Sequence, residues 1–378
     1  MTVCDDAARA FTESFGGEPD GVWCAPGRVN LIGEHVDYAG GLCLPIALEQ
    51  ITAAAVRRRS DGRVRMVSAG FDRAETDLPS LRGRSRVRGW AAYAAGVLYA
   101  LDPPGCTGLD IAVSSNVPVG SGLSSSAALE AAVALATAEL YGLPTDDAGR
   151  DRLAAACVIA ENEYVGAPTG GMDQQIALRG RAGHALLLDC ADGSVEHLPF
   201  DPASHGLTLL VVDTRTAHRL VDGQYGERRR AVEDAARELG VATLRDASSI
   251  DGLDDPVLRR RARHVVTEID RVCLAADALR TGRIHDLGTL LDASHRSLRD
   301  DFEVSCLELD TAVAAAHDAG AAGARMVGGG FGGSAIVLCD LDRVDAIEAA
   351  VTDAAARRAL PAPGFLRAAP AGAARRCR

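Results

Sequence analysis

The chain contains no lysine. All 40 basic residues among its 378 are arginine. Walker-type phosphate loops and Schiff-base enzymes both need a lysine amine, so the sequence excludes both classes. Any anionic ligand therefore has to be neutralised by arginine, by a metal ion or by the N-terminus of a helix.

Long apolar runs and paired cysteine motifs are also missing. No stretch of about 18 apolar residues lacks charge, and the first residues do not resemble a signal peptide, so we expect a cytoplasmic protein with no membrane contact. None of the ten cysteines forms a C-x-x-C pair. Most lie among apolar neighbours, as Cys43 does, and are interpreted as small buried hydrophobic residues in a reducing compartment.

The charge and length of the chain limit its class further. A net charge of -12 argues against nucleic acid or an anionic membrane as the main partner. The length suggests two domains. A polar segment with proline and glycine, Pro199–Gly206, places their boundary near residue 200, giving domains 1–200 and 201–378. With no obvious amphipathic seam, we expect a monomer.

The pattern of apolar residues predicts a mixed architecture. Strands are expected at 22–25, 42–57 and 109–114, and a helix at Leu123–Tyr141. The second half is mostly helical, with a strand, a glycine loop and a strand over 323–340. Strands and helices do not alternate regularly, which favours an α+β fold over a doubly wound sheet.

The most polar short segment is Gly27–Gly41, with the sequence GRVNLIGEHVDYAGG. It carries a guanidinium, an imidazole and two carboxylates in a stretch that also looks half-buried: Arg28, His35, Glu34 and Asp37. These groups make the segment a candidate ligand site, although the segment alone does not identify the ligand.

A second candidate site is the loop before the predicted helix, PVGSGLSSSAALE. The N-terminus of a helix presents unpaired N–H groups that bind phosphate, and Gly120 and Gly122 allow close approach of the backbone. The run Ser124–Ser126 offers hydroxyls to phosphate or Mg²⁺. One serine capping the helix after a glycine turn is the plainer interpretation. Three serines exceed what one cap needs, which favours an anion site.

Two further glycine-rich segments follow. Gly166–Ala177 places Asp173 shortly after Gly170, where it is either a general base or an acidic residue at a helix start. Glu161 is a candidate Mg²⁺ ligand, although a solvated helix-face carboxylate is the plainer interpretation. Gly328–Gly333, GGGFGG, is either a structural hairpin or a close backbone approach, and it lacks the pattern of a dinucleotide site.

Together, the glycine-rich segments resemble the three motifs of the GHMP small-molecule kinases. The stretch APGRVNLIGEHVDYAGG is similar to the galactokinase signature, and the resemblance runs from Val22 to the end. It implies a two-lobed fold with a ribosomal-protein-like N-terminal domain, a ferredoxin-like C-terminal domain and the active site between them. The implied reaction is transfer of phosphate from ATP to the C1 hydroxyl of D-galactose with Mg²⁺.

The same resemblance implies roles for individual residues. Asp173 would be the catalytic residue facing the C1 hydroxyl, with Arg28 beside it. The sugar would be bound by Glu34, His35, Asp37, Gly170 and Tyr225. The nucleotide would contact Trp90, in the adenine pocket, and the phosphate loop formed by Gly120, Ser121, Gly122, Leu123, Ser124, Ser125 and Ser126. Mg²⁺ would be held by Ser125 and Glu161.

Five residues depart from the family pattern without removing a charge: Val36, Thr169, Gly171, Val327 and Ser334. Thr169 and Gly171 line up beside the sugar site, so a kinase for N-acetylgalactosamine or L-arabinose remains an alternative. A non-catalytic sensor of sugar and ATP is another, although the intact Asp173 argues against it. The glycine spacing disfavours a dehydrogenase.

Overall fold

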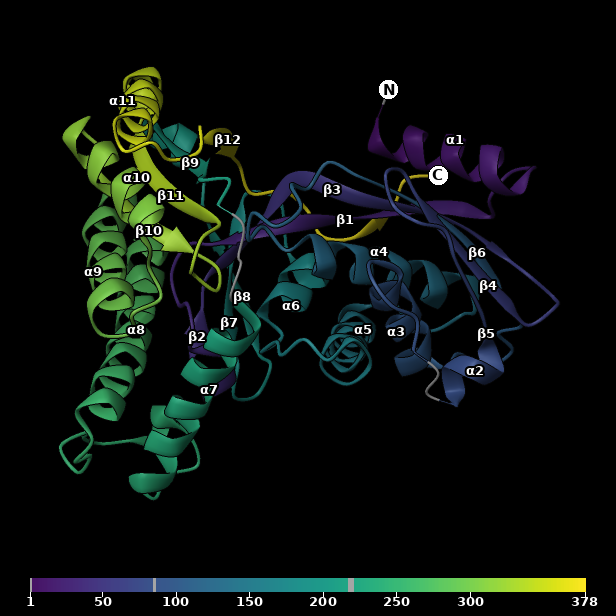
Figure 1. The fold of residues 1–378 in the computed structure, drawn as a ribbon, viewed down its shortest axis with the longest axis horizontal. Coiled ribbons are helices and arrows are strands. Elements are labelled where there is room, and N and C mark those ends of the chain that lie inside the picture. The colour runs from purple at the N-terminus through teal and green to yellow at the C-terminus, as the bar shows by residue number, and fades with distance from the viewer. Residues whose placement is uncertain (1, 84–85, 217–220) are drawn as a thin grey trace.

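The computed structural model describes residues 2–83, 86–216 and 221–378. The chain forms two halves side by side (Figure 1). The first half contains α1 (Val3–Phe15), β1 (Gly21–Asn30), β2 (Leu42–Cys43), β3 (Pro45–Arg58), β4 (Arg63–Ser68), β5 (Ala74–Asp77), α2 (Leu78–Arg82), α3 (Ala91–Leu101), β6 (Leu109–Ser115), α4 (Ser125–Leu140), α5 (Asp147–Ile159), α6 (Met172–Arg179), β7 (His184–Asp189) and β8 (Val195–Pro199). The second contains β9 (Leu207–Asp213), α7 (Val221–Glu238), α8 (Pro256–Arg280), α9 (Leu287–Asp300), α10 (Leu307–Asp318), β10 (Gly323–Val327), β11 (Ser334–Asp340), α11 (Val344–Arg357), β12 (Gly364–Ala368) and β13 (Arg375–Arg376).

The first half is built on a six-stranded sheet in the order β13-β1-β3-β6-β4-β5. Successive side chains of a strand point to opposite faces. Trp23 therefore joins a core with α3 and α4, whereas its neighbours Val22 and Cys24 pack with Phe11 of α1. Figure 1 accordingly shows α1 on one face of the sheet and α3, α4 and α5 on the other.

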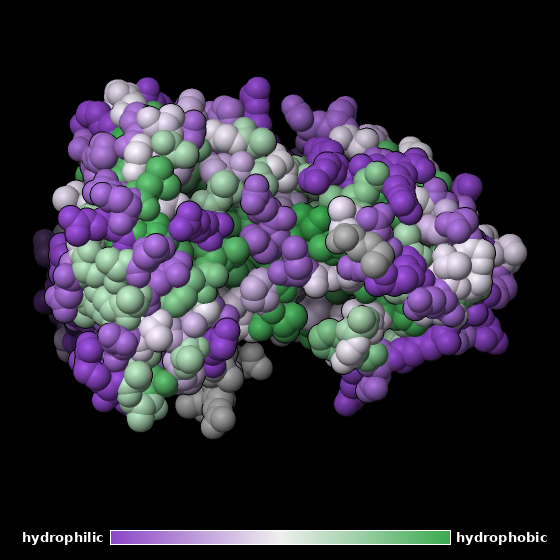
Figure 2. All heavy atoms as spheres, turned by 90° about the horizontal axis from the view of Figure 1, so that it is seen from above, coloured by the Kyte–Doolittle hydropathy of each residue, from purple (hydrophilic) through white to green (hydrophobic). Residues whose placement is uncertain are grey.

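The second half is built on an antiparallel sheet in the order β10-β11-β9-β12, with its helices packed beside it (Figure 1). A shared core joins the two halves. Val29 of β1 and Ile46 of β3 pack in one cluster with Val211 of β9 and Val272 of α8. The surface is indented between the halves, and hydrophilic side chains cover much of the face shown in Figure 2. The predicted α+β fold is confirmed.

The end of the chain returns to the first half. The second sheet begins at Leu207, close to the predicted division near residue 200, but β13 pairs with β1 through Trp23 and Arg376. A disulfide between Cys4 and Cys377 joins the same two regions, a pairing that the cysteine spacing does not predict. The prediction also missed α1 and placed the start of α4 two residues early.

No helix within residues 2–83, 86–216 and 221–378 combines the length and the apolar composition needed to cross a bilayer. The helix before the glycine-rich turn at Gly166 changes its type part-way along. It is an α-helix over Asp147–Ile159 and a π-helix over Ala160–Val165. Such π-helical turns are frequent at functional sites, and this one carries Glu161.

The backbones of helix α9 and of the start of strand β10 are in direct contact at Gly288. One added methyl group at Gly288 is therefore expected to destabilise the fold. A Cβ atom at Gly288 would lie 2.1 Å from the carbonyl oxygen of Ala322. Gly288→Ala should therefore lower the free energy of unfolding by about 1–3 kcal/mol, as overpacking usually does. Urea denaturation measures this. Gly372→Ala is the control, because its Cβ would meet nothing within 4 Å. Equal stability of the two variants would contradict the predicted overpacking.

Candidate active site

A cavity of about 250 Å³ lies between the two halves of the molecule. Its walls come from β1 and the loop after it, the π-helix, the segment leading into α6, α7, and the loop between β10 and β11. The cavity thus brings together most of the predicted catalytic and sugar-binding residues. It is lined by Arg28, Glu34, His35, Asp37, Glu161, Ala167, Pro168, Thr169, Met172, Asp173, Tyr225, Gly328 and Gly329.

A bidentate ion pair between Arg28 and Asp173 stands at the centre of the cavity wall. Arg28 Nε lies 2.7 Å from Asp173 Oδ1, and its Nη2 lies 2.8 Å from Oδ2. The remaining Nη1 donates to the carbonyl oxygen of Gly122 at 2.5 Å. Only 7% of Arg28 is exposed. The planar fork fixes the orientation of the Asp173 carboxylate and places a positive charge beside it.

The loop that leads into α4 meets the same carboxylate. The hydroxyl of Ser124 donates to Asp173 Oδ2. Ser124 occupies the N-cap of α4 with a left-handed backbone (φ 58°), and its side chain makes no capping hydrogen bond. The interpretation of this serine as an ordinary helix cap is therefore wrong. The N-terminus of α4 opens next to the Arg28–Asp173 pair.

A fully buried glutamate, Glu130, and a partly buried one, Glu161, share the amide of Gln174. Gln174 Nε2 donates to Glu161 Oε2 at 2.5 Å and to Glu130 Oε2 at 3.1 Å. Burial, followed by the charge of Asp173, raises the pKa of Glu161 to about 7, and the nearby Ser126 hydroxyl acts in the opposite direction. Glu130 is fully buried, and its Oε1 has no hydrogen-bond partner among the described residues.

The position of Glu161 excludes one interpretation made from the sequence. Glu161 lines the cavity and is not a solvated carboxylate on a helix face. A buried carboxylate oxygen without a partner, beside a second carboxylate whose pKa is raised, is an environment short of positive charge. The donor set is made of oxygen atoms, which suits a hard cation such as Mg²⁺.

Glu34, which is 3% exposed, forms another part of the cavity wall. Its Oε1 lies 2.9 Å from Nη2 of the fully buried Arg325 and accepts the N–H of Gly328 at 2.8 Å. Arg325 also donates to the carbonyl oxygen of Leu31 at 2.9 Å. The glycine loop between β10 and β11 and the strand before it therefore hold Glu34 in place.

Asp37 lines the cavity and packs closely against Gly170. Burial, followed by the charge of Asp173, raises the pKa of Asp37 to about 6. Gly170 passes so close that a Cβ atom there would lie 2.1 Å from Asp37 Oδ2. Gly170 does not line the cavity, but only a residue without a side chain fits against this carboxylate.

His35 is neutral and has both ring nitrogens engaged. Burial, followed by the neighbouring His264, lowers the pKa of His35 to about 3. Nε2 lies 3.2 Å from the carbonyl oxygen of Gly329, so it carries the hydrogen, and Nδ1 accepts from the hydroxyl of Tyr38 at 3.0 Å. The rings of His35 and Tyr225 are 5.3 Å apart. Together they form an aromatic wall on this side.

Trp90 lies at the start of α3, away from the residues that line the cavity. Its Nε1–H donates to the carbonyl oxygen of Asp72 at 2.9 Å, and its ring centroid is 6.3 Å from that of Phe71. A role in the adenine pocket stays a prediction.

Sequence reasoning missed Arg325, Glu130 and Gln174. Two of these residues could have been noticed in the sequence, because Arg325 interrupts an apolar strand and Glu130 interrupts an apolar helix. A charged residue in a buried element needs a partner.

Comparison with known proteins identifies the class of this fold and site. Residues 91–181 match the model of the GHMP kinase N-terminal domain, and residues 275–357 match that of the GHMP kinase C-terminal domain. A mevalonate kinase from Methanococcus jannaschii shares the fold with a TM-score of 0.64 at 15% identity, over 93% of this chain and 98% of that one. The chain has the fold of a GHMP kinase.

The particular family follows from closer relatives. Residues 9–58 match the galactokinase galactose-binding signature. The galactokinase of Streptomyces coelicolor is 48% identical over 387 residues, covering 99% of this chain and 98% of the relative. That of Mycobacterium tuberculosis is 42% identical over 363 residues, covering 94% and 98%. The Lactococcus lactis galactokinase complexed with galactose superposes with a TM-score of 0.92 at 32% identity, over 99% and 100% of the chains. This chain belongs to the galactokinase family.

The effect of the Asp173 charge on Asp37 predicts how the pKa of Asp37 responds to a substitution. The pKa of Asp37 should be near 6 in the wild type and lower in Asp173→Asn, because the second cause of the shift is removed while burial remains. The ¹³C shifts of labelled aspartate carboxyls measure this, with Asp37→Asn assigning the signal. An unchanged pKa in Asp173→Asn would leave burial as the sole cause.

Proposed function

We propose that this chain transfers the γ-phosphoryl group of ATP to the C1 hydroxyl of D-galactose, giving α-D-galactose 1-phosphate and ADP. The observation that carries the proposal is the shared cavity. The galactose-signature carboxylates of Glu34 and Asp37 lie in one space with the Arg28–Asp173 pair, next to the phosphate loop. We also propose that it acts as a cytoplasmic monomer.

Asp173 acts on the sugar hydroxyl. Phosphoryl transfer has a loose transition state, so catalysis depends mainly on positioning and charge stabilisation. The Asp173 carboxylate, held by Arg28 on both oxygens and by Ser124, orients the C1 hydroxyl and accepts its proton as the oxygen attacks the γ-phosphorus. Arg28 stabilises the negative charge of the transferring group.

The sugar is recognised by groups that cannot rotate away. Glu34 is fixed by Arg325 and Gly328, and Asp37 by its close packing against Gly170. A sugar hydroxyl can donate to a carboxylate. A substrate whose hydroxyls are placed differently leaves buried carboxylate oxygens unpaired, which costs binding free energy. Rigid carboxylates therefore favour one arrangement of hydroxyls.

The phosphates of ATP lie on residues 120–126 and the N-terminus of α4, because unpaired N–H groups and the helix dipole attract them. Glu161 and the Ser126 hydroxyl would hold Mg²⁺, which when bound would neutralise charge on the phosphates. We assign Ser126 in place of the expected Ser125, because Ser126 is the serine whose hydroxyl lies near enough to Glu161 to lower its pKa.

The proposal is tested by ADP release from the purified protein with ATP and Mg²⁺. Galactose, N-acetylgalactosamine, glucose, L-arabinose and no sugar are compared, and the product is identified by NMR. Galactose-dependent ADP release with galactose 1-phosphate is the expected result. Turnover with another sugar alone would mean that Val36, Thr169 and Gly171, which depart from the family pattern, set the sugar specificity. Binding of galactose and ATP without turnover would favour a sensor.

Replacing Asp173 should separate chemistry from nucleotide binding. Asp173→Ala removes the proton acceptor, so the rate should fall by about 10²–10⁴-fold, whereas ATP affinity should stay within about twofold because the phosphate loop is intact. Stopped-time product assays and calorimetry measure the two quantities. Asp342→Ala, at an exposed aspartate far from the cavity, is the matched control. Loss of ATP binding in Asp173→Ala would count against the assignment.

Two neighbouring serines test the cation site. Ser126→Ala removes the hydroxyl next to Glu161, so the Mg²⁺ concentration for half-maximal rate should rise about tenfold or more. Ser125→Ala is the adjacent control and should change this concentration much less. Rates over a Mg²⁺ titration at saturating ATP give the comparison. A larger effect in Ser125→Ala would return the role to Ser125.

A further inference from the structure

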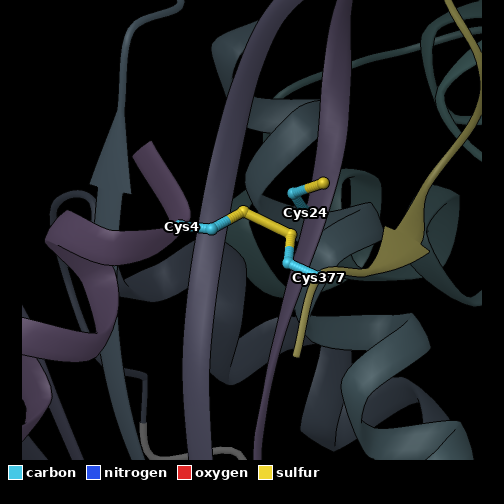
Figure 3. A group of neighbouring side chains, drawn as sticks. All are labelled: Cys4, Cys24 and Cys377. Atoms are coloured by element: carbon cyan, nitrogen blue, oxygen red, sulfur yellow. A yellow bond between two sulfur atoms is a disulfide. The ribbon is translucent and has the colours of Figure 1, made fainter. Parts of the chain in front are cut away.

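Three cysteines far from the cavity meet where the two ends of the chain come together (Figure 3). Cys4 lies in α1, Cys24 on β1 and Cys377 just after β13. Their Sγ atoms all lie within 4.8 Å of one another, and within the described residues this is the only such group of potential metal ligands. Cys4 and Cys377 form the disulfide, whereas Cys24 is a free thiol and fully buried.

Cys24 lies in apolar surroundings with Arg375 close by. Its side chain packs in the apolar layer between α1 and the sheet, beside Ala7 and Phe11. Burial raises the pKa of Cys24, but Arg375 opposes this with its charge and with a hydrogen bond from its backbone N–H. A metal-bound thiolate is commonly supported by such outer hydrogen bonds, so the tail supplies both a ligand and its support.

Geometry and charge agree with a thiophilic cation. Tetrahedral coordination with metal–sulfur bonds of about 2.3 Å requires sulfur atoms roughly 3.8 Å apart. Cys24 already lies within 4.8 Å of both other sulfur atoms, and the Cys4 and Cys377 sulfur atoms have to move apart once their disulfide is reduced. Thiolates select zinc and similar soft or borderline ions over Mg²⁺ and Ca²⁺. Three thiolates with a divalent ion carry one net negative charge, and Arg375 lies beside it to offset that charge.

We propose that Cys4, Cys24 and Cys377, when reduced, bind one thiophilic divalent ion of the Zn²⁺ class and thereby clamp the two ends of the chain together. A dithiol supplies two electrons and two protons that convert the Cys4–Cys377 disulfide to two thiols and is itself oxidised to a disulfide. Each thiol that then binds the ion releases its proton. The disulfide and the metal are alternative closures of one site, and a reducing cytoplasm favours the metal. This proposal is independent of the kinase activity.

The test measures Zn²⁺ binding directly. Protein reduced with a phosphine and freed of metal is loaded with Zn²⁺ in the presence of a chromophoric chelator, and bound zinc is counted by mass spectrometry. The wild type should retain one Zn²⁺ per chain. Cys24→Ser and Cys377→Ser should each weaken binding at least 100-fold. Cys157→Ser, at another fully buried free cysteine, is the matched control and should bind as the wild type does.

A second readout covers the case in which a variant is unstable. Cd²⁺ titration of the reduced wild type should give a sulfur-to-metal charge-transfer band that saturates at one equivalent, and Zn²⁺ should raise the melting temperature of the wild type but not of Cys377→Ser. Cys377 lies in the partly buried tail, so this variant is the less disruptive one. Equal Zn²⁺ binding by the wild type, Cys24→Ser and Cys377→Ser would overturn the proposal, as would the absence of the Cd²⁺ band.

Discussion

The cavity is lined by four carboxylates and one arginine, and the rest of the site is arranged around that imbalance. Two of the acids have their own arginine, Glu34 with Arg325 and Asp173 with Arg28. Asp37 and Glu161 have none, and burial with the charge of Asp173 raises the pKa of each. A site with an excess of negative charge attracts cations, which suits a substrate that binds together with a metal ion.

In a chain without lysine, the Arg28 guanidinium contacts several groups at once. Arg28 binds both oxygens of Asp173 and also the carbonyl oxygen of Gly122, so it joins β1 to α6 and to the loop before α4. A lysine ammonium would be a single point charge and could not fix the plane of the carboxylate. The orientation of Asp173 and the position of the loop before α4 are therefore coupled through one side chain.

The second half of the molecule contributes mainly support to the site. Gly328 donates to Glu34, Gly329 accepts from His35, and the Ser334 hydroxyl donates to the carbonyl oxygen of Ser121 at 2.7 Å. The loop is also an ordinary hairpin, because Val327 pairs with Ser334 in the antiparallel β10–β11 ladder. Both interpretations of GGGFGG hold, since the turn and the contacts use different atoms of the same backbone.

Sequence reasoning predicted the parts of the site that are local. The α+β class follows from the spacing of apolar residues, and the polar stretch around Glu34 and Asp37 is visible in a short segment. The partners were not predictable in the same way. Arg325, Glu130 and Cys377 act across long separations, and a single sequence contains no record of which distant residues the fold brings together. The π-helical turn at Glu161 was missed because its residues look helical in any register.

Strand β13 gives the molecule an unusual order of assembly. β1 is paired with β3 on one edge and with β13 on the other, through Trp23 and Arg376. A ribosome adds about 5–20 residues per second, so the outer edge of β1 waits on the order of tens of seconds for its partner. An unpaired edge is a template for association with other strands. The nascent chain is thus most exposed to aggregation just before its last residues emerge, and removal of the tail would make that exposure permanent.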